Sequence, residues 1–65
     1  MTRDEVIKTC KIGDKVRLKK SYDKKPVSGE AIRFTDNHIV LDRDSDGSNI
    51  DAVAFVSIEW IKLEK

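Results

Sequence analysis

The chain of 65 residues has few of the residues that form disulfide bonds or structural metal sites in small proteins, since it holds one cysteine and one histidine. It also holds only one proline. A single cysteine, Cys10, excludes an internal disulfide bond. A lone histidine, His38, excludes a histidine cluster for a structural metal. Because a chain this short has a thin core, closure of a sheet or association of several copies is the expected source of further stability.

The sequence also lacks segments that would direct it to a membrane or out of the cell. No apolar run approaches the ~20 residues that cross a bilayer, and no signal-peptide pattern is present. Together with the single cysteine, these absences predict a soluble cytoplasmic protein with no membrane partner.

Catalytic motifs are missing as well. The sequence contains no glycine-rich phosphate loop, no metal-ligand set and no paired-carboxylate spacing. Cys10 lies on the apolar side of a predicted helix, where an inert thiol is expected rather than a nucleophile that works with His38. The chain is therefore predicted not to be an enzyme, and no cofactor, metal or small-molecule substrate is expected.

Charged residues are abundant, at 38% of the chain. Residues 1–33 hold ten Lys or Arg against five Asp or Glu, a net charge of +5. Residues 34–65 hold three against seven, a net charge of −4. This split predicts a basic face if folding keeps the halves apart, and a mixed surface if their strands interleave.

Local patterns predict one helix and five strands. Thr2 and Glu5 stand at capping-box spacing, which predicts a helix over about residues 3–10. This helix is expected to plug one open end of the sheet, the alternative being a lid that faces a ligand or partner. Apolar patterning and turn residues predict strands over 15–19, 27–34, 38–43, 50–56 and 57–63.

Gly29 lies inside the predicted strand 27–34. Glycine within a strand usually marks a bulge or a sharp bend, and a long strand that bends in its middle lets a very small sheet close on itself. The expected fold is therefore mainly β, a bent five-stranded barrel with a short N-terminal helix. It forms one domain over residues 1–65, with the helix at about 3–10 and the barrel at about 14–64.

The predicted strand 50–56 is apolar on both faces from Ala52 onward. A strand of a small antiparallel barrel normally shows polar residues to solvent, so a second copy of the chain is expected to cover it. A slip in the alternation between Trp60 and Ile61 predicts a bulge or a tight corner. The predicted subunit interface comprises Ala52, Val53, Ala54, Phe55, Val56 and Trp60.

This layout resembles the Sm-like (Lsm/Hfq-type) family of small SH3-like barrels. Val27-Ser28-Gly29 is similar to the apolar-x-Gly that opens the first Sm motif. Phe34 follows Gly29 by five residues and Ile39-Val40-Leu41 by ten to twelve, which is the Hfq-type spacing. Residues 56–61 resemble the short strand, turn and last strand of the second motif. The similarity covers about residues 3–63.

The resemblance implies a homo-oligomeric ring, formed through the fourth and fifth strands, that binds single-stranded RNA. The residues expected to supply phosphate contacts and a stacking surface are Lys15, Arg17, Lys19 and Tyr22. The residues expected at the base site, in the turn after the second strand, are Thr35, Asp36, Asn37 and His38. Without the resemblance, the residues of the phosphate set are expected on a solvated strand face. Those of the base set are then expected to form an ordinary turn.

The second motif departs from the family pattern. Neither the Lys-His pair of Hfq-type proteins nor the Arg-Gly pair of Sm and Lsm proteins is present, since the corresponding stretch reads Ala54-Phe55-Val56-Ser57. Two alternatives therefore stay open. One is a monomeric SH3- or Tudor-like module that holds a peptide with Tyr22, Phe55 and Trp60. The other is an accessory protein in which the fold serves assembly alone.

The segment from Asp42 to Gly47 resembles the start of an EF-hand calcium loop, with acids at positions one, three and five and glycine at six. Position twelve falls on Val53, where a bidentate glutamate is required, and predicted strands flank the segment. A solvated hairpin loop is therefore the expected structure.

Overall fold

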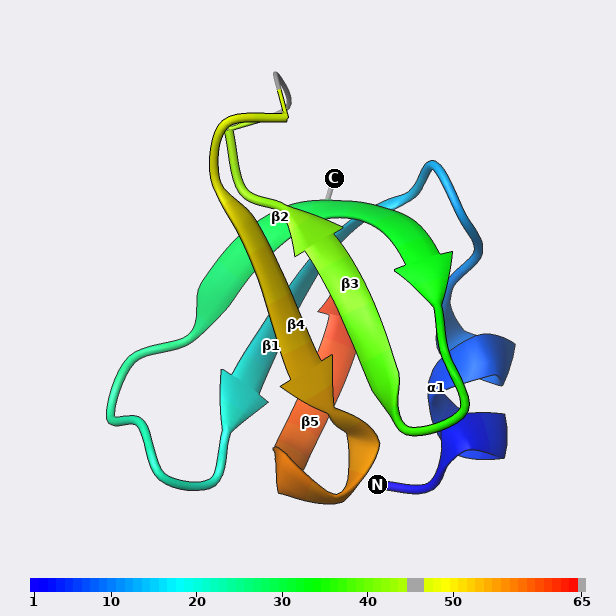
Figure 1. Cartoon of the computed structure of the whole chain (residues 1–65). Coiled ribbons are helices and arrows are strands. Elements are labelled where there is room, and N and C mark those ends of the chain that lie inside the picture. The colour runs from blue at the N-terminus through cyan, green and yellow to red at the C-terminus, as the bar shows by residue number, and fades with distance from the viewer. Residues whose placement is uncertain (45–46, 65) are drawn as a thin grey trace.

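The computed structural model describes residues 1–44 and 47–64. Figure 1 shows its elements, which are α1 (Arg3–Thr9), β1 (Lys15–Lys20), β2 (Val27–Phe34), β3 (His38–Asp42), β4 (Ile50–Ala54), the 3-10 turn η1 (Phe55–Ser57) and β5 (Ile58–Leu63). The helix and all five predicted strands are present. The fourth strand ends at Ala54, two residues earlier than expected, because the chain turns there into η1.

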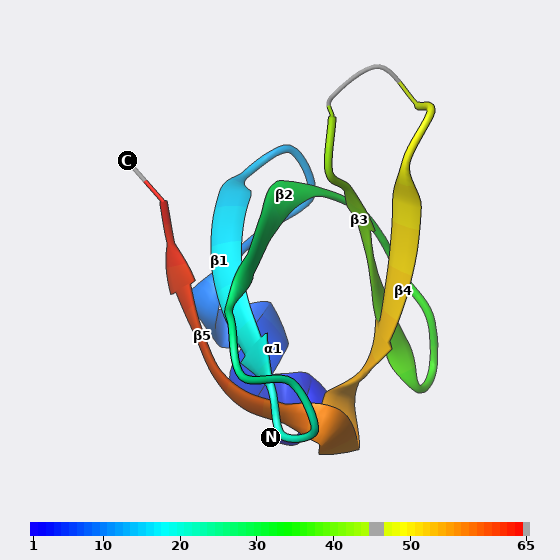
Figure 2. The ribbon, with the colours of Figure 1, turned by 90° about the vertical axis from the view of Figure 1, so that its left-hand side faces the viewer.

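The five strands form one antiparallel sheet in the order β4-β3-β2-β1-β5. β2 pairs with β1 through residues 27–30 and with β3 through residues 30–34. Figure 2 shows the result, a sheet bent so that β5 and β1 lie on one side and β3 and β4 on the other. The two halves of the fold therefore meet along β2.

The sheet is bent but not closed. β4 pairs with β3 alone and β5 with β1 alone, so β4 and β5 are the edges of the sheet in the described structure. The three-residue turn η1 carries the chain from one edge to the other without making them a hairpin. The expected mainly β fold with a short N-terminal helix is confirmed, whereas the closed barrel is not.

Gly29 lies where β2 passes from one neighbour to the other. A Cβ atom at this position would lie 3.0 Å from the carbonyl oxygen of Asp42, 3.2 Å from Cβ of Leu41 and 3.3 Å from Cα of Arg43. These atoms belong to the main chain or to the first side-chain carbon, so they cannot rotate away. The end of β3 therefore approaches β2 this closely only because residue 29 has no side chain.

Two register shifts adjust the sheet to this bend. One lies between Ala31 and Arg33 in the β2–β3 pair. The other lies in the β1–β5 pair, where Lys19 is opposite Trp60 but Lys20 is opposite Ile58. The irregularity was predicted between Trp60 and Ile61, whereas the structure has it earlier in β5, with Glu59 as the extra residue.

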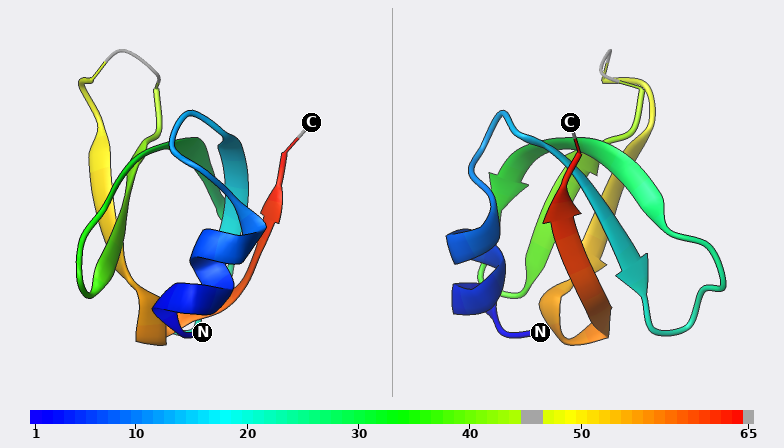
Figure 3. Two further views of the ribbon diagram at one scale, coloured as in Figure 1. Left: turned by 90° about the vertical axis from the view of Figure 1, so that its right-hand side faces the viewer. Right: turned by 180° about the vertical axis from the view of Figure 1, so that it is seen from behind.

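The core lies inside the bend and draws on every element. Its buried apolar residues are Val6, Cys10, Val16, Leu18, Ala31, Ile39, Leu41, Val53, Phe55, Ile58 and Ile61. Thr2 and Glu5 form the predicted capping box, with the Thr2 amide donating to Glu5 Oε1 at 2.9 Å and the Glu5 amide to Thr2 Oγ1 at 3.3 Å. Figure 3 shows α1 at one opening of the bent sheet, as expected of a plug.

An ion pair ties the two arms of the sheet together. Lys20 Nζ lies 2.9 Å from Asp51 Oδ2, which joins the end of β1 to β4, on the opposite arm of the bend. The two side chains are only 13% and 23% exposed. The hydrogen bond to Asp51 raises the pKa of Lys20 above its ordinary value of 10.5, outweighing the opposite effect of burial.

Substitution of Gly29 tests the close approach of β2 and β3. Gly29→Ala should lower the free energy of unfolding by about 1–3 kcal/mol, because the added methyl group must displace main-chain atoms. Urea denaturation measures this loss. The control is Ser28→Ala in the same strand, which should change stability by no more than ~0.5 kcal/mol. Equal stabilities of Gly29→Ala and the unmodified protein would contradict the constraint.

The Lys20–Asp51 pair should contribute more to stability than an exposed ion pair. Asp51→Asn removes the hydrogen-bonded partner of the largely buried Lys20 ammonium and leaves only Asp23, at 3.9 Å, so it should cost about 1–3 kcal/mol in urea denaturation. Glu59→Gln, which removes the partner of Lys19 at a carboxylate that is 53% exposed, should cost only ~0.2–1 kcal/mol. Similar losses in the two variants would contradict this ranking.

The same pair predicts a pH dependence. Since the pKa of Lys20 is raised on folding, its stabilising contribution is complete below the pKa of an unfolded lysine. It is lost as the pH rises through the higher pKa of the folded state. As the pH rises from neutral, the stability difference between the unmodified protein and Asp51→Asn should therefore shrink only at strongly alkaline pH. A difference that disappears between neutral pH and the ordinary lysine pKa would contradict this origin.

Candidate functional site

The outer face of β1 and β5 carries a row of cations. We call Lys15, Arg17, Lys19 and Lys62 the basic strip. Arg17 and Lys62 stand directly opposite each other in neighbouring strands, and Lys19 stands opposite Trp60. Lys62 Nζ lies 5.3 Å from the centre of the Trp60 ring. The strip thus places an aromatic ring among three positive charges.

Like charges that face each other across a strand pair are destabilising. Lys19 is paired with Glu59, but neither Arg17 nor Lys62 forms an ion pair with any carboxylate within the described ranges. Arg17 and Lys62 are also both exposed. The pair is therefore a place where a bound anion would remove a repulsion that the chain itself leaves in place.

Lys62 was not predicted from the sequence. It stands 45 positions after Arg17 in the chain, and only the pairing of β1 with β5 brings the two together. No local pattern signals this juxtaposition. The only indication was the general one, that strands from the basic and acidic halves interleave in a small sheet.

The turn between β2 and β3 is held mainly by Thr35. Its Oγ1 accepts hydrogen bonds from the amides of His38 at 2.9 Å and Asn37 at 3.4 Å, and its amide donates to the His38 carbonyl at 2.8 Å. The Asn37 carbonyl accepts from the Phe55 amide at 2.9 Å, which fixes the turn against η1. Thr35 is therefore used structurally, whereas the side chains of Asp36 and Asn37 are exposed at the tip of the turn.

A hollow of about 370 Å³ lies beside this turn, and we call it the turn hollow. Its lining residues are Met1, Thr2, Arg3, Asp36, Asn37, Phe55 and Val56. Arg3 Nε donates to the Thr35 carbonyl at 3.2 Å, and the Met1 nitrogen donates to the carbonyls of Phe55 and Ile58. The first residues of the chain thus form part of the wall, which the sequence did not indicate.

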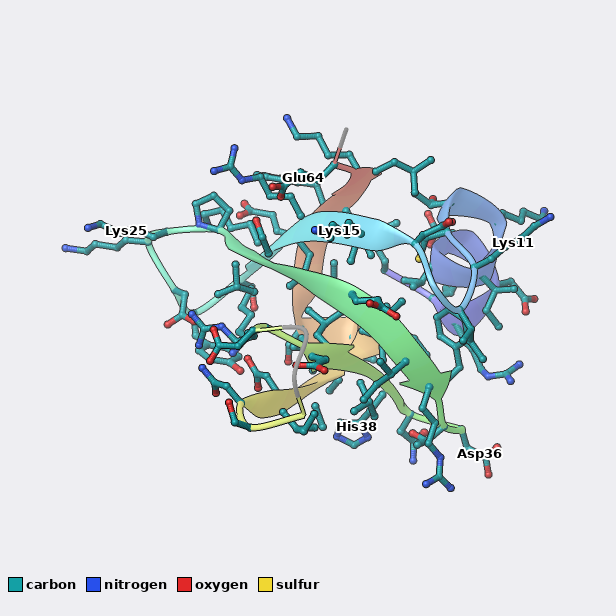
Figure 4. The ribbon with its side chains drawn as sticks, turned by 90° about the horizontal axis from the view of Figure 1, so that it is seen from above. Lys11, Lys15, Lys25, Asp36, His38 and Glu64 are labelled. Carbon is teal, nitrogen blue, oxygen red and sulfur yellow. The ribbon has the colours of Figure 1, made fainter. Side chains whose placement is uncertain are left out.

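The predicted RNA-binding residues fall into separate groups. Figure 4 shows Lys15 on one side of the molecule and Asp36 and His38 on the opposite side. Tyr22, which is 69% exposed, lies in the β1–β2 connection with its ring centre 5.8 Å from Lys20 Nζ. A single copy of the chain therefore does not bring the strand set and the turn set into one site.

A second cationic surface lies between the β1–β2 connection and the end of β3. This hollow of about 520 Å³ is lined by Lys20, Asp23, Lys24, Lys25, Pro26, Val27 and Arg43. Lys24, Lys25 and Arg43 form no ion pair with a carboxylate of the described residues. This hollow therefore extends the positive potential of the chain beyond the basic strip.

The predicted subunit interface is divided between core and surface. Val53 and Phe55 are 1% and 3% exposed, because Val53 faces inward opposite Ile39 and Phe55 enters the core at the start of η1. Their side chains are therefore not available to a partner. Ala52 is exposed and Val56 is 87% exposed, whereas Ala54 and Trp60 are half-buried. Further apolar side chains are exposed on the edge strands at Ile50 and Leu63.

Cys10 is the one thiol of the chain and is 2% exposed. Its Sγ lies 3.6 Å from the Val6 carbonyl, to which it donates. Burial, assisted by the negative charge of Asp14, raises the pKa of this thiol. The side chain therefore packs as a small apolar residue, as its position on the predicted helix indicated.

Within residues 1–44 and 47–64, no three His, Cys, Asp or Glu side chains are grouped so that they could hold a metal ion. In the same ranges, no helix is long and apolar enough to cross a membrane. No family model, curated protein or solved structure matches the chain.

Proposed function

We propose that this chain is a non-catalytic RNA-binding protein of the Sm-like type that acts as a homo-oligomeric ring on single-stranded RNA. The observation that carries this proposal is the exposed pair of Arg17 and Lys62, which repel each other across β1 and β5 and have no counter-ion in the described structure. A phosphate bound between them would neutralise both charges. The neighbouring Trp60 ring offers a face on which a base can stack.

The two free edges of the sheet support the ring. An exposed edge strand has unpaired main-chain donors and acceptors that another strand can satisfy. Because β4 and β5 are both edges of one sheet, β4 of each copy can pair with β5 of the next, and this head-to-tail contact closes a ring. The exposed apolar side chains of Ile50, Ala52 and Leu63 on these strands favour burial against a partner. Such pairing would join the sheets of neighbouring copies and leave no edge strand unpaired.

A ring also resolves the separation of the candidate residues. The basic strip and the turn set lie on opposite sides of one copy, but a ring repeats both around its axis. A flexible RNA strand would then bind phosphate sites and base sites of different copies. Several weak contacts made by one strand give a much higher total affinity than each contact alone.

The peptide-binding alternative finds less support. It would require Tyr22, Phe55 and Trp60 on one accessible surface, and Phe55 is 3% exposed in the core. Tyr22 and Trp60 alone do not form an aromatic groove. A role in assembly without RNA would appear as a ring that binds no oligonucleotide.

Arg17→Glu separates RNA binding from folding. The change replaces a repulsive cross-strand pair with an attractive one, so stability should stay constant or rise by ~0.2–1 kcal/mol. RNA affinity should fall, and the slope of log affinity against log salt should decrease in magnitude by about 1 for each phosphate that the variant no longer neutralises. Fluorescence anisotropy with labelled oligouridine and oligoadenine measures the affinity and its salt slope.

The matched control is Lys8→Glu, which makes the same charge change at an exposed position of α1. It should leave the salt slope unchanged. RNA binding by the unmodified protein that is absent or independent of salt would refute the proposed function. Equal reductions of affinity in the two variants would show that net charge, and not the basic strip, governs binding.

Ala52→Lys tests the assembly. A lysine on the exposed edge of β4 should block strand pairing between copies and yield a monomer in native mass spectrometry. The control is Ile12→Lys, which also replaces an exposed apolar side chain but lies between α1 and β1. It should leave the ring intact. A monomeric unmodified protein would refute the ring and leave RNA binding to be judged from the anisotropy measurement.

A further inference from the structure

The last residue of β3, Asp42, has an unusual environment for a carboxylate. The residue is only 8% exposed. Oδ2 accepts a hydrogen bond from the Gly47 amide at 2.9 Å. Oδ1 is buried and has no hydrogen-bond partner in the described structure. One half of this carboxylate is therefore withdrawn from water without compensation.

No positive charge of the described residues offsets this burial through an ion pair. The ion pairs in these ranges join Lys19 to Glu59 and Lys20 to Asp23 and Asp51, and none reaches Asp42. The residue opposite Asp42 in β2 is Glu30, a second acid. A buried charge without a partner is costly, and an unsatisfied buried oxygen in an ordered site commonly marks a position for water or an ion.

The hydrogen bond from the Gly47 amide brings Oδ2 of Asp42 against Gly47, beyond the end of β3. Gly47 has a φ of +80°, which lets the chain turn back toward Asp42. Asp44, two residues after Asp42, is exposed in the same loop. Calcium loops place carboxylates at positions one and three and a glycine at position six for the sharp turn. Asp42, Asp44 and Gly47 occupy those positions.

We propose that Asp42 Oδ1 and the Asp44 carboxylate bind a calcium ion in this loop. Water would complete the coordination, because calcium accepts a flexible set of oxygen ligands. Magnesium fits less well, since it gives up its own water reluctantly and the Asp42 oxygen is buried. Asp46, the next acid in the spacing, lies outside the described residues and is not among the two ligands proposed.

This inference revises the sequence-based expectation of a solvated hairpin loop. Val53 still occupies the twelfth position, so the bidentate glutamate of high-affinity loops is absent. The affinity should therefore lie in the ~10⁻⁴–10⁻³ M range of the weakest calcium modules. The bound ion would link the end of β3 to Asp44, and it acts independently of RNA binding.

The Gly47 amide provides a site-specific test. Calcium chloride, titrated into chelator-treated ¹⁵N-labelled protein, should shift the Gly47 resonance along a saturable curve, because the oxygen that accepts its hydrogen bond belongs to the liganding carboxylate. Magnesium chloride at the same concentrations should produce a smaller shift. Sodium chloride at matched ionic strength should produce none.

Asp44→Asn and Asp36→Asn form the matched pair of variants. Each removes one exposed carboxylate, but only Asp44 lies in the proposed site. Asp44→Asn should weaken calcium binding by at least the ~10–100-fold that removal of a group supporting a metal ligand costs, and Asp36→Asn should leave it unchanged. The inference is overturned if calcium does not shift Gly47, if magnesium shifts it more, or if both variants weaken binding equally.

Discussion

The fold depends on one steric constraint, the close approach of β2 and β3 at Gly29. At this point residues 41–43 pass so close to β2 that a Cβ atom at residue 29 would force them to shift. The bend that results allows β2 to pair with β1 through its first half and with β3 through its second half. The buried residues of both arms then face one another, which gives a chain of this size a continuous core.

Much of the architecture was predictable, because the patterns that indicate its helix and strands are local in sequence. The interior glycine, the alternation of Val16 and Leu18 with basic residues, and the capping box of Thr2 and Glu5 each depend on neighbours a few positions apart. The open edges were not predictable. Whether two strands at opposite ends of a sheet meet depends on the geometry of the whole bend, which no short pattern encodes.

The candidate surfaces also combine residues that local sequence patterns identify with residues that only the folded structure brings together. Lys15, Arg17 and Lys19 were identifiable because strand alternation puts them on one face. Lys62 joins them only through a pairing between distant parts of the chain. Val53 and Phe55 were expected at an interface because their segment is apolar on both sides, yet the inward direction of each depends on its place relative to η1. Apolar composition alone does not distinguish a core position from a position at an interface.

The burial of Cys10 has a practical consequence for the dynamics of α1. The thiol belongs to the core cluster that joins this helix to the sheet, and it is the only one in the chain. An alkylating reagent can reach it only when the helix detaches, so the modification rate, divided by the rate for a free thiol, reports the opening equilibrium of that helix. Cys10 is thus a native probe of the opening of α1 at its contact with the sheet, and no label has to be engineered into the protein.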